Sequence, residues 1–301
     1  MDNLRNEKAL LPEYELKVDV PGGQLAVHRF GPQGGRPIVA VHGVTSSNRA
    51  WQCFAGALVP HGFTIYAPDL RGRGHSNQLP PPFGMENHAR DVVALLDHLN
   101  LDRVDVVGHS MGGFVTVALL ARYPERVAKA VLIDGGIPLG LPPGMTADQV
   151  LPLVLGPALA RLAMTFESKD AYRDYWRVQP AFVKGWGNVH DEYSDFDLQG
   201  NPPALWPRTN KDAVEEDSRD LFESDLISTT LANLDRELPL LRAQRGLQNE
   251  EVPLYPDPIL NAVLPSYPRV KRIDVADVNH YDILLEQSGA DRCAEIIYGV
   301  K

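Results

Sequence analysis

Cysteine is scarce in this sequence, since only Cys53 and Cys293 occur among 301 residues. Two cysteines cannot build the disulfide framework of a small secreted domain, and a reducing compartment is the natural setting for such a chain. The first eight residues are polar and mixed in charge, without the apolar stretch of a secretory signal. We therefore expect a cytoplasmic protein in which the two cysteines are not bridged.

An excess of basic residues and long apolar runs are also lacking. Lys and Arg number 29 against 39 Asp and Glu, which gives a formal net charge of −10. Nucleic acids and anionic membranes are normally bound through a basic face, so this balance argues against both as partners. No apolar run approaches the roughly 18 residues of a membrane span. Hydrophobic residues still make up 44% of the chain, enough for a large globular core.

Motifs for metals and nucleotides are missing as well. The sequence has no cluster of Cys and His with the spacing of a zinc site, and no glycine-rich loop of the kind that binds phosphate. Four acidic residues are close together but lack the spacing of a calcium-binding loop, namely Asp191, Glu192, Asp195 and Asp197. We interpret them as a solvated face. We expect the protein to work without a metal or another cofactor.

Strands and helices alternate in the first half of the chain. Four short apolar runs are typical of buried parallel strands: 37–42, 63–67, 104–107 and 128–133. Helical stretches separate them at 48–59, 85–99 and 111–123. Residues 15–20 and 24–30, joined by Pro-Gly-Gly, predict a hairpin before them. This pattern predicts an α/β fold with a mostly parallel sheet and helices on both faces.

The alternation stops at Ile137 and does not return until about residue 228. Proline and glycine are frequent in between, and three of the four tryptophans occur there. We expect residues 137–227 to form a helical cap, inserted into a core made of residues 1–136 and 228–301. Two further strands at 239–243 and 270–275 would complete a sheet of eight. The tryptophans Trp176 and Trp186 are candidates for contacts with an apolar substrate.

The strongest chemical signal is Gly108-His109-Ser110-Met111-Gly112, a G-x-S-x-G motif. It follows a predicted strand and opens a predicted helix, so the chain turns sharply with Ser110 at the apex. Larger residues in place of the two glycines would clash in that turn. The helix N-terminus then favours negative charge at the site. In this context a chance glycine-rich turn is disfavoured, and Ser110 is predicted to be a nucleophile.

Two further segments supply what a serine nucleophile needs. His42-Gly43-Val44-Thr45 follows the strand at 37–42, and the backbone N–H groups of Val44 and Met111 are candidates for an oxyanion hole. A simple strand-end turn is the competing interpretation of this segment. A serine hydroxyl also needs a base, and His280 lies late in the chain, after a strand, where a base could reach Ser110. We therefore predict His280 as the general base.

The acid that orients the base has two candidate locations. One is the loop at 246–251, which follows the strand at 239–243, and the other is Asp134, at the end of the strand at 128–133. Either carboxylate could accept from the far ring nitrogen of His280 and stabilise the imidazolium. Asp134 has an equally plain structural interpretation, as a strand-end residue bonded to nearby backbone.

Four segments of this sequence resemble the α/β-hydrolase superfamily: VHGVTSSNRAW at 41–51, YAPDLRGRGHS at 66–76, VVGHSMGG at 106–113 and DVNHYDIL at 277–284. The resemblance covers residues 13–136 and 228–299, and is closest to the branch of esterases, lactonases and carbon–carbon hydrolases with a cap after the sixth strand. It implies Ser110 as nucleophile, His280 as base, and Val44 and Met111 as oxyanion donors. Serine at the elbow, where relatives of other chemistry carry aspartate, disfavours epoxide hydrolysis and dehalogenation.

The chain departs from the family after its seventh strand. The family commonly has Gly-x-x-Asp there, whereas the third residue after Gly246 is Asn249, an amide that cannot carry charge. Some branches place the acid at the end of the sixth strand, which here is Asp134. We therefore predict Asp134 as the acid, with Glu250, one residue beyond the usual place, as the alternative.

The expected activity is that of a serine hydrolase acting on a small apolar ester, thioester or lactone through an acyl-enzyme. Two alternatives remain open. A carbon–carbon bond hydrolase would use the same residues, and only a substrate test separates it. A ligand-binding member of the fold without activity is disfavoured by the complete set of serine, histidine and oxyanion donors.

Overall fold

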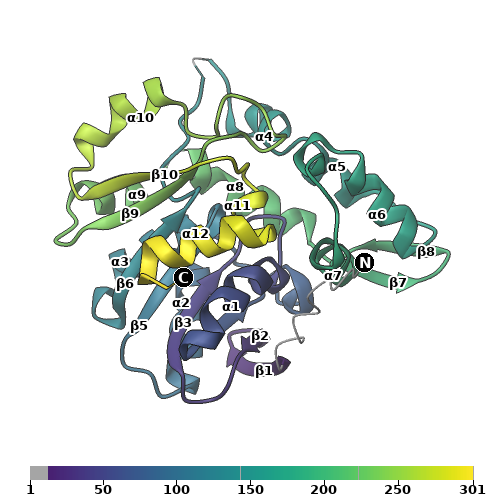
Figure 1. Cartoon of the computed structure of the whole chain (residues 1–301), viewed down its shortest axis with the longest axis horizontal. Coiled ribbons are helices and arrows are strands. Elements are labelled where there is room, and N and C mark those ends of the chain that lie inside the picture. Colours follow the sequence, from purple (N-terminus) through teal and green to yellow (C-terminus); the bar gives the residue numbers. More distant parts are fainter. Residues whose placement is uncertain (1–12, 143, 223, 301) are drawn as a thin grey trace, which may run out of the picture.

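The computed structural model describes residues 13–142, 144–222 and 224–300. Its centre is an eight-stranded sheet in the order β1-β2-β4-β3-β5-β6-β9-β10 (Figure 1). Strand β2 is antiparallel to both β1 and β4, and the other neighbouring pairs are parallel. The strands are β1 (Glu13–Val20), β2 (Gly23–Phe30), β3 (Arg36–Val41), β4 (Phe63–Pro68), β5 (Val104–His109), β6 (Val127–Ile133), β9 (Leu238–Ala243) and β10 (Val270–Val275). The prediction of a mostly parallel sheet of eight strands is confirmed.

Strand residues alternate between the two faces of the sheet, because successive side chains of a strand point to opposite sides. On β3, Ile38 and Ala40 pack on the face covered by α1 (Gln52–Leu58) and α12 (Gln287–Tyr298). Val39 and Val41 pack on the other face, under α2 (Met85–His98) and α3 (Met111–Arg122). Figure 1 shows α1 and α12 together in front of the sheet. The inner strands are therefore buried on both sides, which explains their continuous apolar sequences.

The register of the parallel strands brings four chain segments to one edge of the sheet. Val41 of β3 pairs with Gly108 of β5, and His109 pairs with Ile133 of β6. Ile133 in turn pairs with Leu241 of β9. The residues that follow these strands therefore leave the sheet side by side at its carboxyl end, where open α/β sheets bind ligands.

The segment between β6 and β9 adds helices and one hairpin to this core. Its elements are α4 (Ala147–Leu155), α5 (Pro157–Ala160), α6 (Lys169–Arg177), α7 (Asn188–Phe196), β7 (Leu198–Asn201), β8 (Ala204–Pro207), α8 (Lys211–Phe222) and α9 (Asp225–Ala232). Residue 227, the expected boundary of the insertion, lies inside α9. The antiparallel hairpin β7–β8 does not follow from the sequence pattern. Its strands are short, and the proline and glycine residues at 200–207 are more typical of a loop. In Figure 1, α5, α6, α7, β7 and β8 extend to the right of the sheet, whereas α9 lies on the left near β9.

The remaining helices are short. They are α10 (Asp257–Val263) and α11 (Asp282–Leu285), with 3-10 helices at Asn48–Trp51, Val59–His61, Gly74–Ser76, Pro124–Arg126, Arg161–Ala163, Pro180–Phe182 and Leu264–Ser266. Glu286, which has an extended backbone, separates α11 from α12.

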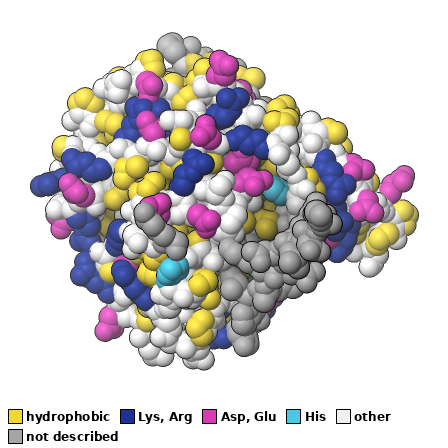
Figure 2. All heavy atoms as spheres, in the orientation of Figure 1, with side chains coloured by type: hydrophobic (Ala, Val, Ile, Leu, Met, Phe, Trp, Pro, Cys, Tyr) yellow, Lys and Arg dark blue, Asp and Glu magenta, His cyan; other side chains and the backbone are white. Residues whose placement is uncertain are grey.

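The charge distribution on the surface and the length of the helices agree with the amino-acid composition. On the face shown in Figure 2, basic and acidic side chains are interspersed rather than gathered into a basic patch. Within the described residues, every helix is too short or too polar to cross a membrane. Cys53 and Cys293 are both buried and are not bridged.

Candidate active site

Ser110 stands at a strained turn between β5 and α3. Its backbone has φ 54° and ψ −124°, a region that non-glycine residues rarely adopt. A Cβ atom on Gly108 would clash with the carbonyl oxygen of Gly112, and one on Gly112 would clash with that of Val41. The two glycines therefore allow the chain to turn so sharply that the Ser110 side chain projects beyond the end of the sheet.

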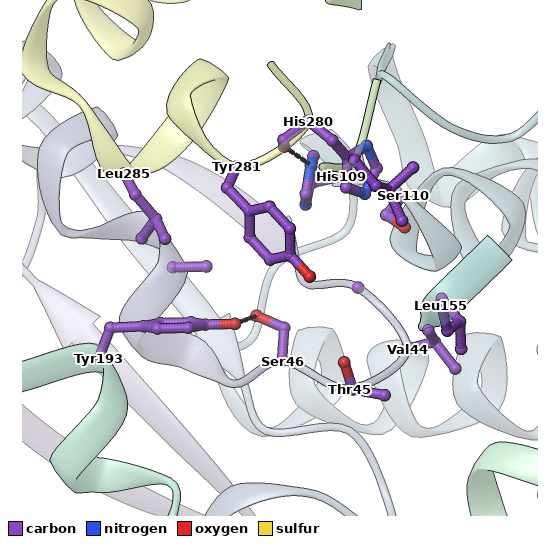
Figure 3. A pocket seen from close by; sticks show the side chains of 13 residues that line it. Val44, Thr45, Ser46, His109, Ser110, Leu155, Tyr193, His280, Tyr281 and Leu285 are labelled. Atoms are coloured by element: carbon purple, nitrogen blue, oxygen red, sulfur yellow. Dashed lines mark hydrogen bonds between the residues drawn. The ribbon is translucent and has the colours of Figure 1, made fainter. Parts of the chain in front are cut away.

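His280 and Asp134 meet across 146 residues of sequence. Nδ1 of His280 lies 2.6 Å from Oδ2 of Asp134, and both side chains are buried. Oδ1 of Asp134 accepts a hydrogen bond from the amide of Ala243 at 3.1 Å. With Nδ1–H donating to the carboxylate, Nε2 of His280 is left as a proton acceptor. Ser110 and His280 border the same cavity (Figure 3).

Glu250, the alternative acid, has other surroundings. It is exposed, and its carboxylate accepts a hydrogen bond from the amide of Gln248 at 2.8 Å. Asn249 adopts φ 63°, and its side-chain oxygen accepts from Nε of Arg245 at 2.6 Å. The loop after β9 is thus held by its own residues, while the carboxylate beside His280 comes from the end of β6.

The two candidate oxyanion donors lie next to Ser110. Met111 begins α3, and Val44 lies in the turn after β3. Within the described part of the chain, neither backbone N–H donates a hydrogen bond to another residue. Both residues line a cavity that Ser110 and His280 also line. A developing negative charge at that position would find two free donors and a helix N-terminus.

Buried polar residues hold the Val44 turn from behind. His42 donates from Nδ1 to the carbonyl of Gly43 at 2.8 Å, and its Nε2 accepts from the amide of Leu70 at 3.0 Å. Burial lowers the pKa of His42 to about 3, so the ring stays neutral and keeps this tautomer. Arg73 donates from Nε to the carbonyl of Val44 at 2.9 Å and is ion-paired with Asp217 of α8. These contacts tie the turn to the core and to the inserted segment.

His109 supports the backbone that carries His280. Its Nε2 donates to the backbone carbonyl of His280 at 2.9 Å, and the two rings pack with centroids 4.6 Å apart. Burial, with a smaller contribution from His280, holds the pKa of His109 well below its usual range. His109 therefore remains neutral and fixes the backbone that carries His280.

Two small cavities adjoin at Ser110. One has a volume of about 30 Å³ and the other about 20 Å³, so each holds at most a few water molecules. They share Val44, Ser110, Leu155, Leu247 and His280 as lining residues. A substrate of ordinary size therefore has to push these side chains apart on binding.

The two candidate tryptophans lie outside these linings. Trp176 is buried behind Tyr281, with ring centroids 6.3 Å apart. Trp186 packs on Phe182 at 5.5 Å and donates from its ring nitrogen to Asp191 at 2.7 Å. The residue that sequence reasoning missed is Tyr281, which lines the larger cavity. Its position directly after His280 is the signal that could have identified it.

The acidic run of the inserted segment is only partly a solvated face. Asp197 is buried and pairs with Arg161 at 3.2 Å, which corrects the interpretation of this residue. Asp195 pairs with Arg173 at 2.7 Å. Among the residues that the structure describes, no group of three His, Cys, Asp or Glu side chains could hold a metal ion.

Comparison with known families gives one match that spans half of the chain. A family model for the alpha/beta hydrolase fold matches residues 36–188. The matched region runs from β3 into α7 and includes Ser110, Asp134 and the Val44 turn.

Curated relatives match about two fifths of the chain. A putative non-heme haloperoxidase of Mycobacterium phage D29 is 37% identical over 122 residues, which are 40% of this chain and 43% of the relative. The lipase LipV of Mycobacterium tuberculosis is 39% identical over 115 residues, 38% of this chain and 43% of the relative. The chain thus aligns with less than half the length of these relatives.

Among solved structures, an E-2-(acetamidomethylene)succinate hydrolase superposes with a TM-score of 0.76 at 20% identity. The superposition covers 96% of this chain and all of the other. At this identity the likeness concerns the fold, which extends through the inserted segment and the C-terminal strands.

Proposed function

This chain belongs to the α/β-hydrolase fold family, and on that premise we propose that it is a serine hydrolase cleaving a carboxylic ester, thioester or lactone through an acyl-enzyme. The observation that carries the proposal is the contact of 2.6 Å between Asp134 and His280, at a cavity shared with the strained Ser110. Such an arrangement lets a histidine take a proton from a serine hydroxyl while a carboxylate stabilises the resulting imidazolium.

In the proposed reaction, Nε2 of His280 removes the hydroxyl proton of Ser110 as Oγ attacks the substrate carbonyl carbon. The carbonyl oxygen takes the negative charge and accepts hydrogen bonds from the amides of Val44 and Met111. When the tetrahedral intermediate collapses, His280 gives its proton to the leaving oxygen or sulfur. Water then attacks the acyl-enzyme, with His280 as base again, and releases the acid and the free Ser110.

The inserted segment is proposed to act as a cap that selects the substrate. It contributes Leu155 and Tyr193 to the larger cavity, and Leu139, Val154 and Leu221 to the smaller one. Side chains from this segment therefore border both spaces next to Ser110. A change in its position or composition would alter which acyl and alcohol groups fit.

A fluorophosphonate probe provides the direct test. We expect it to add one phosphonyl group to the wild-type protein, at Ser110, as seen by intact mass and by peptide mapping. Turnover is then followed by proton release over a panel of esters, thioesters and lactones of varied chain length. A protein that neither reacts with the probe nor hydrolyses any member of the panel would contradict the proposal.

A further inference from the structure

The two cavities at Ser110 differ in their chemistry. The residues found only in the smaller one include the apolar side chains Phe114, Leu139, Val154, Leu221 and Leu254. Those found only in the larger one include five polar side chains. Thr45, Ser46, Tyr193 and Tyr281 carry hydroxyls, and His109 has a ring with two nitrogen atoms. An apolar group and a polar group of one substrate would therefore separate between them.

Tyr281 has the hydroxyl best placed to meet a substrate. Figure 3 shows it pointing into the space between Ser46 and Ser110. Among the described residues, none forms a hydrogen bond with this hydroxyl. Burial raises the pKa of Tyr281 well above its usual value, so the group remains protonated and acts as a donor. The Tyr281 side chain is half-buried at the cavity wall, so a substrate acceptor can bind its hydroxyl in place of water.

Neighbouring hydroxyls reinforce this donor character. Tyr193 donates to Oγ of Ser46 at 3.1 Å, which leaves the Ser46 hydrogen free to donate in turn. The hydroxyl of Thr45 faces the same space in Figure 3. A substrate oxygen at this place would be surrounded by donors rather than acceptors.

The charge behind this group of hydroxyls is balanced. Arg161 is buried and donates from Nη2 to the backbone carbonyl of Thr45 at 2.7 Å. The same nitrogen lies 3.2 Å from the carboxylate of Asp197. Because the cation already has an anionic partner, the cavity suits a neutral acceptor better than a second carboxylate.

From these contacts we propose that Tyr281 is a substrate-binding residue, and that the substrate carries a neutral carbonyl-type oxygen a few bonds from the scissile carbonyl. This inference rests on the proposed serine hydrolase function. In the bound state the Tyr281 hydroxyl donates to that oxygen, while the remaining apolar part of the substrate occupies the smaller cavity.

The experiment compares isosteric esters with and without the second oxygen. In the acyl chain, 4-oxopentanoyl is paired with 4-methylpentanoyl, and in the alcohol, 3-oxobutyl is paired with 3-methylbutyl. A succinate monoester supplies a carboxylate at a similar distance. For each pair the ratio of kcat/KM, ketone over hydrocarbon, is measured by proton release for the wild type, Tyr281→Phe and Tyr123→Phe. Tyr123 is the matched control, because it lies at the far end of α3, about 20 Å along the helix from Ser110.

We expect the wild type to favour a ketone ester over its hydrocarbon partner on one side of the ester bond. Tyr281→Phe should lower that ratio about threefold to tenfold, mainly through KM, whereas Tyr123→Phe should leave it unchanged. An equal slowing of both esters, or an unchanged ratio, in Tyr281→Phe would overturn the inference. A preference for the succinate monoester over the ketone would overturn its neutral-acceptor part. Absence of both probe labelling and ester turnover in the wild type would instead reject the proposed function, and this inference with it.

Discussion

Arg73 donates a hydrogen bond from Nε to the backbone carbonyl of Val44, across 2.9 Å in the protein interior. The amide of the same residue, Val44, is the candidate oxyanion donor. We predict that Arg73→Lys lowers kcat about tenfold to a hundredfold with little change in KM. A displaced Val44 amide would stabilise the transition state less well but would hardly affect substrate binding. Steady-state kinetics on the best ester measure this split.

Arg71 provides the matched control for this prediction. It is also buried, two residues away, and pairs with Asp91 through Nε and Nη2 at 2.9 Å. Its guanidinium also donates to the backbone carbonyls of Pro80 and Pro21, away from the Val44 turn. Both lysine variants should lose about 1–3 kcal/mol of unfolding free energy. Equal losses of kcat in the two variants would show that Arg73 acts through general stability alone.

Ser110→Ala should abolish hydrolysis while the protein stays folded. Removing the nucleophile is expected to cost several powers of ten in kcat, leaving the contribution of the oxyanion donors and of substrate binding. Circular dichroism and the thermal midpoint should remain close to those of the wild type, since Ala fits the space of Ser. Near-wild-type turnover on the best substrate would refute Ser110 as the nucleophile.

The acid assignment is tested by two isosteric substitutions. Asp134→Asn removes the charge next to His280 and can stabilise the wrong ring tautomer, so kcat should fall by about 10³-fold to 10⁴-fold. Glu250→Gln changes an exposed carboxylate and should leave kcat within about twofold. The measurement is kcat for both variants at pH 7 and at pH 9. The reverse ranking would assign the role to Glu250.

His42 should make the fold sensitive to mild acid. Burial lowers its pKa to about 3, whereas the pKa in an unfolded chain is about 6.5. Between these values the unfolded state binds a proton that the folded state does not, so stability is lost as pH falls. From pH 7 to pH 5 this loss amounts to about 2 kcal/mol.

Urea unfolding of His42→Asn tests this relation. The difference in unfolding free energy between wild type and variant should narrow by about 2 kcal/mol when the pH is changed from 7 to 5. His61→Asn, at an exposed histidine, is the control and should show no such narrowing. Parallel pH profiles for wild type and His42→Asn would contradict the expectation.

Trp176 and Trp186 should differ in their influence on substrate choice. Trp176 packs on Tyr281 and lies against the guanidinium of Arg161, 5.2 Å from its ring centroid. Trp176→Phe should therefore shift relative kcat/KM values across an ester panel by about tenfold. Trp186→Phe should shift them less, because its ring contacts do not reach the cavity lining. An unchanged rank order in both variants would remove the tryptophans from substrate selection.

Local sequence patterns sufficed to predict the turn at Ser110 and the position of Asp134. Each lies at the end of an apolar strand, and parallel strands end at a common edge. The contact of Arg73 with Val44 and the burial of Asp197 could not be predicted in this way. The first contact joins two core loops and is supported by Asp217 of the inserted segment, while Asp197 is buried by partners within that segment. Neither kind of packing leaves a periodic pattern in the sequence.

The location of Tyr281 illustrates the same limit at closer range. Its place beside His280 is plain in the sequence, but the direction of its hydroxyl depends on Trp176 of α6 and on Phe182, against which its ring packs. Side chains between the core and the inserted segment take their orientation from both. Only the structure of the core, with its alternating strands and helices, could be predicted from the sequence.

The carboxylate at the end of β6 also affects how this protein can diverge. With Asp134 as the proposed acid, residues 246–251 do not have to supply a charge, and Leu247 is their contribution to both cavities. Asp134 has no such freedom, because it adopts φ 45° and is followed by Gly135, where a Cβ atom would clash with the backbone of Ser110. Substitutions and changes of length should therefore be tolerated better in the loop after β9 than at Asp134. Substrate preference can change through this loop while the proposed acid is kept.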